Sequence, residues 1–141
     1  TDYCLTHRTP CDVYFCDEKG PQKASARTTQ DFDAFYNLCG QLAFTAESGA
    51  GAMMEYSMER EVGAYRYIVV THELDGGLYS AAVRASARGN DVTVVLLRDT
   101  LTEEQQNIRA YMSDASVQVV QIERDRDFAD VFAQTVTGGA L

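Results

Sequence analysis

A short polar stretch, residues 71–77, places a histidine and two acids directly after the apolar run of residues 67–70. If this run is a central strand of a parallel sheet, the stretch lies at its carboxyl end, where open α/β sheets bind ligands. A histidine with acids close behind it can act as a general base or bind a metal. The same residues also fit a strand-to-helix loop, in which Asp75 caps the helix and Gly76-Gly77 allows the turn. We predict the loop.

Acids also follow the other apolar runs of the chain. Four of them would gather around one crevice if these runs were neighbouring parallel strands: Asp17, Glu73, Asp75 and Asp99. Carboxylates bind magnesium, so a magnesium-dependent phosphotransfer or nuclease-type enzyme is the alternative function. Such sites use an Asp-x-Asp pair, which Glu73-x-Asp75 only approximates. Nucleophile-elbow, dinucleotide-binding and Walker A motifs are absent from the sequence.

The chain has four cysteines: Cys4, Cys11, Cys16 and Cys39. None forms a Cys-x-x-Cys motif, and neither histidine stands at zinc-finger spacing from them. Cys16 lies in an expected strand and Cys39 on the apolar face of an expected helix, so we interpret both as small buried hydrophobic residues. We predict structural thiols, in preference to a disulfide or a metal site, and free thiols suit a reducing compartment.

The composition is that of an ordinary globular protein of 141 residues, 45% hydrophobic and 23% charged. A chain of this length buries roughly two thirds of its unfolded surface, so we expect one domain that folds without disulfides or metals. The net charge of −9 argues against nucleic acid as the main partner. No stretch approaches the ~20 apolar residues of a membrane helix. We expect a fragment of a longer chain that is cytoplasmic, or the soluble domain of a membrane-anchored protein.

The second half of the chain alternates strand and helix signals. Apolar, β-branched runs predict strands at residues 67–70, 91–97 and 116–122, the last at an edge because its polarity alternates. Helices are expected at residues 78–88, after a capping box formed by Thr102 and Gln105, and at residues 127–136. This order predicts an α/β fold with right-handed crossovers and a mostly parallel sheet.

The first half has a weaker pattern. Residues 12–16 read as a buried strand, and residues 17–30 read as a polar loop. Spaced apolar residues from Phe32 to Ala46 predict a helix, which Gly49-Ala50-Gly51 would end. Residues 52–58 then read as a further strand.

Residues 67–76, YIVVTHELDG, precede an alanine-rich segment and then RGNDVTVVLL at residues 88–97. This stretch resembles the later half of a von Willebrand factor A-type domain, and more narrowly the bacterial DUF58 branch. The resemblance implies a three-layer Rossmann-like fold, with helices on both faces of a mostly parallel sheet. It also implies that residues 13–17 form the opening strand, and that the protein acts in assembly or regulation beside a MoxR-type AAA ATPase.

The resemblance further implies a metal-ion-dependent adhesion site, which this sequence does not preserve. Asp17 matches the first aspartate of the site and Thr71 matches its loop threonine. Lys19, Pro21 and His72 stand where the family has two serines and the last aspartate. A lysine ammonium repels a cation and proline offers no ligand atom, so we expect no metal at this site.

We therefore expect a non-catalytic protein-interaction or assembly module with a degenerate adhesion site. Its expected binding edge lies at the carboxyl ends of the strands and comprises Asp17, Lys19, Thr71, His72, Glu73, Asp75 and Asp99. The expected partner is a protein, such as an AAA ATPase, and neither nucleic acid nor a cofactor is expected. The sequence leaves the oligomeric state open.

Overall fold

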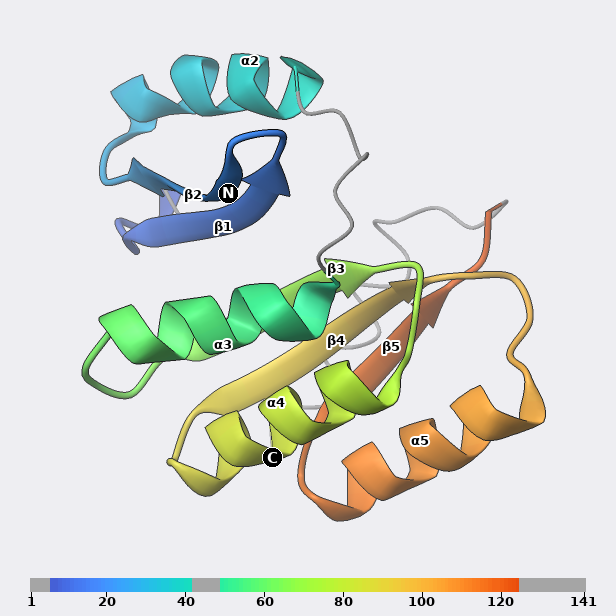
Figure 1. Ribbon diagram of the computed structural model, residues 1–141. Helices are drawn as coiled ribbons and strands as arrows, with labels where there is room; N and C mark the ends of the chain where they lie inside the picture. The colour runs from blue at the N-terminus through green and yellow to red at the C-terminus, as the bar shows by residue number, and fades with distance from the viewer. Residues whose placement is uncertain (1–5, 42–48, 125–141) are drawn as a thin grey trace. The chain divides into compact units, whose positions relative to one another are not determined.

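The computed structural model describes residues 6–41 and 49–124 of the chain (Figure 1). The chain divides into two compact units, residues 1–49 and residues 50–141. The predicted helix at residues 127–136 lies outside the described residues, as do Cys4 and the last residues of the helix predicted to reach Ala46. In the described part of the chain, no helix is long and apolar enough to cross a membrane.

The first unit contains a β-hairpin followed by a helix. Strands β1 (Cys11–Asp17) and β2 (Gly20–Ala26) pair antiparallel along their whole length. A short 3-10 helix, η1 (Thr29–Asp31), leads into α2 (Phe32–Gln41). Ala26 is the one buried residue among residues 6–41. An isolated two-stranded hairpin is marginally stable, so this unit has little core of its own.

The hairpin corrects the sequence predictions for residues 12–30. β2 occupies part of the predicted loop, and β1 is part-exposed along its length instead of buried. Gly20 lies in the hairpin turn with a φ of +98°, which glycine adopts without strain. The sequence pattern missed β2 because small and polar residues fill it, so its pairing with β1 makes it a strand. Among the described residues β1 pairs with β2 alone, and this antiparallel ladder lends no support to residues 13–17 as the opening strand of a parallel sheet.

The cysteines of the first unit only partly match their prediction. Cys16 and Cys39 are free thiols, and both Cys11 and Cys16 are half-buried. Cys39 is exposed, so its interpretation as a buried residue is wrong. No residue of α2 is fully buried, but Phe32, Phe35 and Leu38 are half-buried at helical spacing and form its inward-facing stripe.

Asp12 is the electrostatic centre of the hairpin. Its carboxylate lies 2.8 Å from the Arg27 guanidinium and 3.2 Å from the Lys23 ammonium. Burial raises the pKa of Asp12, but side-chain hydrogen bonds, of which that from Arg27 is the largest, outweigh burial and lower the pKa to about 2. A carboxyl with a lowered folded-state pKa stabilises the fold above its unfolded pKa of 3.8 and loses this contribution as the pH falls toward 2.

We expect Asp12→Asn to cost the hairpin about 1 to 2 kcal/mol at pH 7 and almost nothing at pH 2. Urea unfolding at pH 7, 4 and 2, followed by the NMR signals of the Val13 methyl groups, measures this difference. Glu18→Gln, in the exposed turn of the same hairpin, serves as the charge-matched control and should track the wild type. A cost for Asp12→Asn that is equal at all three pH values would contradict the prediction.

The second unit is a parallel α/β arrangement. Its elements in chain order are α3 (Ala50–Arg60), β3 (Arg66–Thr71), α4 (Gly76–Ala87), β4 (Asp91–Leu97), α5 (Glu103–Asp114) and β5 (Gln118–Ile122). The strands pair parallel in the order β3-β4-β5. This confirms the predicted α/β class, the three predicted strands and β5 as an edge strand. Thr102 and Gln105 form the predicted capping box at the start of α5.

Three predictions that concern the second unit are wrong. Residues 52–58 belong to helix α3, not to a strand, and Gly51, Met54 and Met58 are buried at helical spacing. The Gly-Ala-Gly sequence, interpreted as a stop signal, instead lies at the start of this helix. Strand β3 is at an edge of the described sheet, and β4, not β3, is central.

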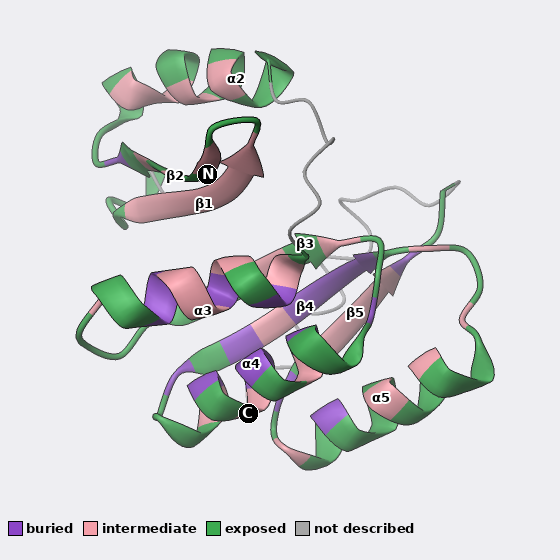
Figure 2. Cartoon of the chain, in the orientation of Figure 1, coloured by how far each residue is buried: buried purple, intermediate pink, exposed green. Residues whose placement is uncertain are grey.

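Helices α3, α4 and α5 pack on one face of the sheet, which we call the inner face (Figure 1). Leu78 of α4, Met112 of α5 and Leu96 of β4 belong to a single core, and β4 has the longest buried run (Figure 2). Successive side chains of a strand point to opposite faces. Tyr67 and Val69 therefore pack against this core, while their neighbours on β3 point to the outer face.

Candidate functional site

The predicted binding edge divides between the two units. Asp17 and Lys19 belong to the first unit, whereas its five other residues belong to the second: Thr71, His72, Glu73, Asp75 and Asp99. Each unit is described by itself, so the structure tests only the neighbours within each group. That all seven residues share one edge stays a prediction.

Asp17 and Lys19 lie at the tip of the β1–β2 hairpin. The Asp17 carboxylate accepts a hydrogen bond from the backbone N–H of Lys19 at 2.8 Å. Asp17 is also the last residue of β1, paired with Gly20. An aspartate that bonds the backbone two residues further on closes a turn, so Asp17 stabilises this hairpin.

Thr71, His72 and Glu73 form a local turn at the carboxyl end of β3. The Thr71 hydroxyl accepts a bond from the Glu73 N–H and donates one to the Glu73 carbonyl, each at 3.1 Å. The His72 and Glu73 side chains lie 3.8 Å apart and are 80% and 64% exposed. An exposed pair of this kind contributes little energy, and it leaves both side chains accessible to a partner.

Asp75 has the helix-capping role that the sequence predicts. Its backbone is extended, with φ −120° and ψ 172°, and its carboxylate accepts a bond from the Leu78 N–H at 2.7 Å. The preceding Leu74 is 3% exposed and belongs to the core. The loop is thus held at both ends, by a buried leucine and by a helix cap, and the prediction of a strand-to-helix loop is confirmed.

Asp99 lies beyond β4 in a backbone network that the sequence did not reveal. Its carboxylate accepts a bond from the Arg124 N–H at 2.8 Å, and the Gln121 amide donates to the carbonyls of Arg98 and Asp99. The Arg98 guanidinium also reaches the His72 carbonyl at 3.5 Å. In the sequence, Gln121 stands out only as a polar residue in the alternating pattern of β5. Nothing in that pattern linked it to the loop after β4, more than twenty residues earlier.

These contacts determine what the edge of the second unit can do. Asp75 is engaged with a helix N-terminus, and Asp99 joins the ends of β4 and β5. Over residues 6–41 and 49–124, no three of the His, Cys, Asp and Glu side chains come together as they would around a metal ion. Asp75 and Asp99 therefore act as structural groups of their own loops, whereas the Glu73 side chain stays exposed.

The outer face of the sheet has an exposed apolar surface on β3. Ile68 is 58% exposed and Val70 is 61% exposed, and Leu97 at the end of β4 is 39% exposed. Parallel register places Val70 beside Val95, which is 1% exposed. The continuous apolar run at residues 67–70 predicts burial on both faces, so the sequence did not anticipate this exposed surface.

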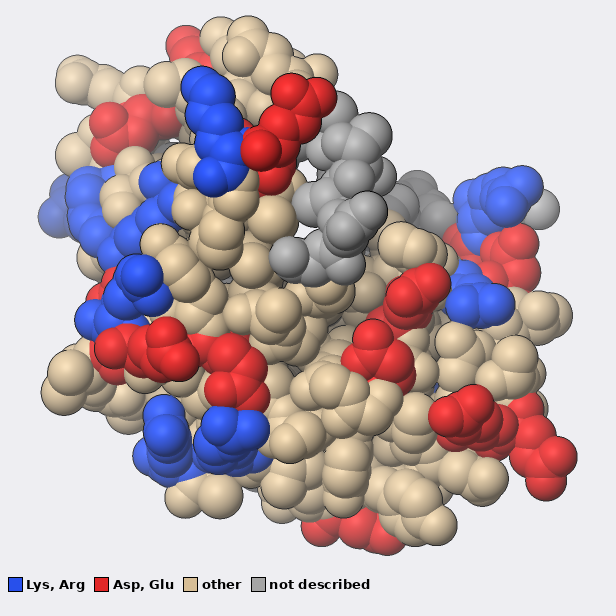
Figure 3. Space-filling view, viewed as in Figure 1, with Lys and Arg blue, Asp and Glu red and all other residues tan. Residues whose placement is uncertain are grey.

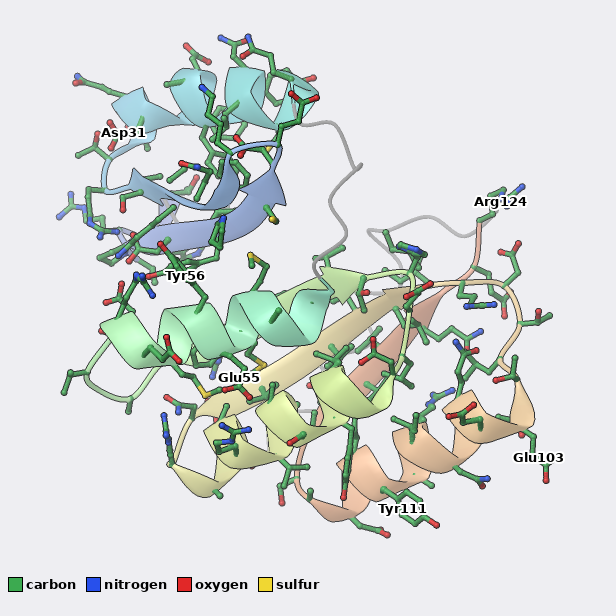
Figure 4. The ribbon with its side chains drawn as sticks, viewed as in Figure 1. Asp31, Glu55, Tyr56, Glu103, Tyr111 and Arg124 are labelled. Carbon is green, nitrogen blue, oxygen red and sulfur yellow. The ribbon has the colours of Figure 1, made fainter. Side chains whose placement is uncertain are left out.

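Charged side chains gather instead over α3 and α4, where acids and arginines lie side by side (Figure 3). Glu55, which points from α3 toward α4 in Figure 4, meets the Arg84 guanidinium at 2.7 and 2.9 Å. Arg60 stacks on the ring of Tyr56, 3.5 Å from its centroid. Glu55 and Arg84 are thus paired within the unit, and a part-exposed pair of this kind adds little stability.

Comparisons with known proteins assign no family to the chain. The resemblance to von Willebrand factor A-type domains therefore depends only on the residues quoted for it, and the function must be argued from the surfaces and contacts of the molecule. No family model, no curated protein and no solved structure matches the chain.

Proposed function

We propose that the chain is a non-catalytic protein-interaction module, and that the outer face of β3 is the surface that binds the partner. The observation that carries this proposal is the exposure of Ile68 and Val70, two β-branched side chains that lie two residues apart on one strand. Exposed apolar patches on otherwise polar surfaces mark interaction sites. His72 and Glu73, both exposed, extend the surface at the carboxyl end of the same strand.

Burying the exposed apolar side chains of β3 would contribute a moderate free energy to binding. Burying an isoleucine or valine side chain completely contributes about 1.5 to 3 kcal/mol. Ile68 and Val70 are each more than half exposed, so covering both would contribute on the order of 2 kcal/mol. A partner would need further contacts around this centre to bind stably.

The alternative, a magnesium-dependent enzyme, would need free carboxylates that face one point. In the second unit Asp75 caps a helix and Asp99 binds a backbone N–H, so neither is poised to hold a metal and a substrate. Among residues 6–41 and 49–124, no contact brings free carboxylates together as the enzyme would need. The interaction module is therefore the better-supported function.

The resemblance completes the proposal. In it, the second unit is part of a three-layer domain of the von Willebrand A kind, with α3, α4 and α5 as one helical layer. The partner is a MoxR-type AAA ATPase, and the adhesion site is degenerate because Lys19, Pro21 and His72 replace its ligands.

We expect Ile68→Lys and Val70→Lys each to weaken binding to a MoxR-type ATPase at least about tenfold, because each introduces a charge that the partner must desolvate. Sedimentation velocity of the chain mixed with the purified ATPase measures the complex. Val62→Lys is the matched control, since Val62 is 96% exposed and lies in a loop before β3. Circular dichroism should show all three variants folded. No complex with the wild type, or equal loss for all three variants, would reject the proposal.

A further inference from the structure

We infer that the partner docks by adding an extended strand to the free edge of β3, which pairs with no strand other than β4 among the described residues. This inference rests on the proposed function and specifies how the partner contacts β3. The site is the row of backbone N–H and C=O groups along Arg66–Thr71, together with the side chains of Ile68 and Val70 beside it. The occupant is a segment of another polypeptide in β conformation.

The hydrogen bonds at the start of β3 show which of its backbone groups face β4 and which point away from it. The Tyr65 carbonyl accepts a bond from the Asp91 N–H at 3.1 Å, and the Tyr65 N–H donates to the Asn90 side chain at 2.8 Å. The N–H and C=O of one residue in a strand point to the same side, and this side alternates along the chain. The backbone groups of Ile68 and Val70 therefore point away from β4, toward the free edge.

This edge lacks the devices that normally protect a sheet from strand addition. Proteins protect free edges with proline, lysine, bulges or inward-pointing charges. β3 has the sequence RYIVVT, without proline or lysine, and its register with β4 is unbroken. Its only charged residue, Arg66, is at the start of the strand and pairs with Asp91 at 3.2 Å.

The edge also determines the chemistry of its occupant. A helix satisfies its own backbone groups and cannot pair with those of Ile68 and Val70, whereas a β-strand supplies donors and acceptors at the matching spacing. Alternate side chains of the added strand would lie on the outer face, next to Ile68 and Val70. The expected partner segment is therefore extended and carries apolar, β-branched residues at every second position.

The test uses the whole chain and a synthetic strand, acetyl-Lys-Thr-Val-Thr-Val-Thr-Val-Lys-amide. Amide hydrogen exchange is measured by NMR with and without the peptide at millimolar concentration. We expect the amides of Ile68 and Val70 to slow at least about tenfold, while the amide of Val69, already bonded to β4, is unchanged. Two N-methylated peptides are the controls. The peptide methylated on the edge that pairs with β3 should protect neither amide, whereas the peptide methylated on its opposite edge should protect both.

Two results would overturn the inference. Unchanged exchange at Ile68 and Val70 with every peptide would show that the edge does not accept a strand. Slow exchange of both amides in the free chain, together with sedimentation as a dimer, would show that a second copy is the occupant instead. If the ATPase binds and Ile68→Lys weakens it, but the amides of Ile68 and Val70 stay unprotected in the complex, the proposed function survives and strand addition fails.

Discussion

Replacing Gly51 with alanine is expected to destabilise the second unit by about 3 kcal/mol, at the upper end of the usual cost of overpacking. A β-carbon at Gly51 would lie 2.7 Å from the carbonyl carbon of Gly77 and 2.7 Å from the nitrogen of Leu78. These are backbone atoms at the start of α4, so no flexible side chain can move to make room. The clash must push α3 away from α4 and open the core around Met54 and Leu78.

Gly76→Ala is the matched control for this prediction. Gly76 is also a helical glycine next to the same contact, but a β-carbon there would meet nothing within 4 Å. Alanine lowers the entropy of the unfolded chain, so this variant should be neutral or up to about 1 kcal/mol more stable. Urea unfolding of both variants, followed by far-UV circular dichroism, gives the two free energies. Equal stabilities would show that α3 and α4 do not approach each other at Gly51.

Gly51 also shows why sequence analysis failed for α3 but succeeded for β3 and β4. The runs at β3 and β4 are apolar over several successive residues, so their own pattern identifies them. Asp75 and Thr102 cap their helices through contacts within three residues, which a sequence displays directly. The sequence alone does not distinguish a glycine that allows close approach to another helix from a glycine that ends a helix.

The features of the candidate site also divide into those that local sequence predicts and those that depend on distant contacts. The loop after β3 was predictable because its turn and cap are local, whereas the hydrogen bond between Asp99 and Arg124 joins the loop after β4 to the residues after β5. The exposure of Ile68 and Val70 depends on which face the helices cover, and nothing in the apolar run itself records that choice. β2 was missed for a related reason, since its strand conformation depends on pairing with β1.

Asn90→Ala is expected to cost about 2 kcal/mol, because it removes two hydrogen bonds that one buried side chain makes. The Asn90 side chain is the link between the end of α4 and the start of β3. Its amide donates to the Ala85 carbonyl at 2.9 Å, and its oxygen accepts from the Tyr65 N–H at 2.8 Å. Asn90 itself is 8% exposed, so water cannot readily replace either bond. Asn107→Ala, on the exposed surface of α5, is the control and should change stability by less than about 0.5 kcal/mol.

Asn90→Asp separates the two bonds of this side chain. At pH 7 the carboxylate can still accept from the Tyr65 N–H, but it cannot donate to Ala85 and it carries a charge into a buried site. At pH 3 a protonated carboxyl recovers one donor, so the stability gap to the wild type should narrow as the pH falls. The gap narrows in this direction because a buried carboxyl without a cationic partner has a raised folded-state pKa. Such a carboxyl destabilises the fold most when it is ionised. Urea unfolding of the wild type and Asn90→Asp at both pH values measures the gap, and a gap that widens at pH 3 would show that the donor to Ala85 is not what Asn90 contributes.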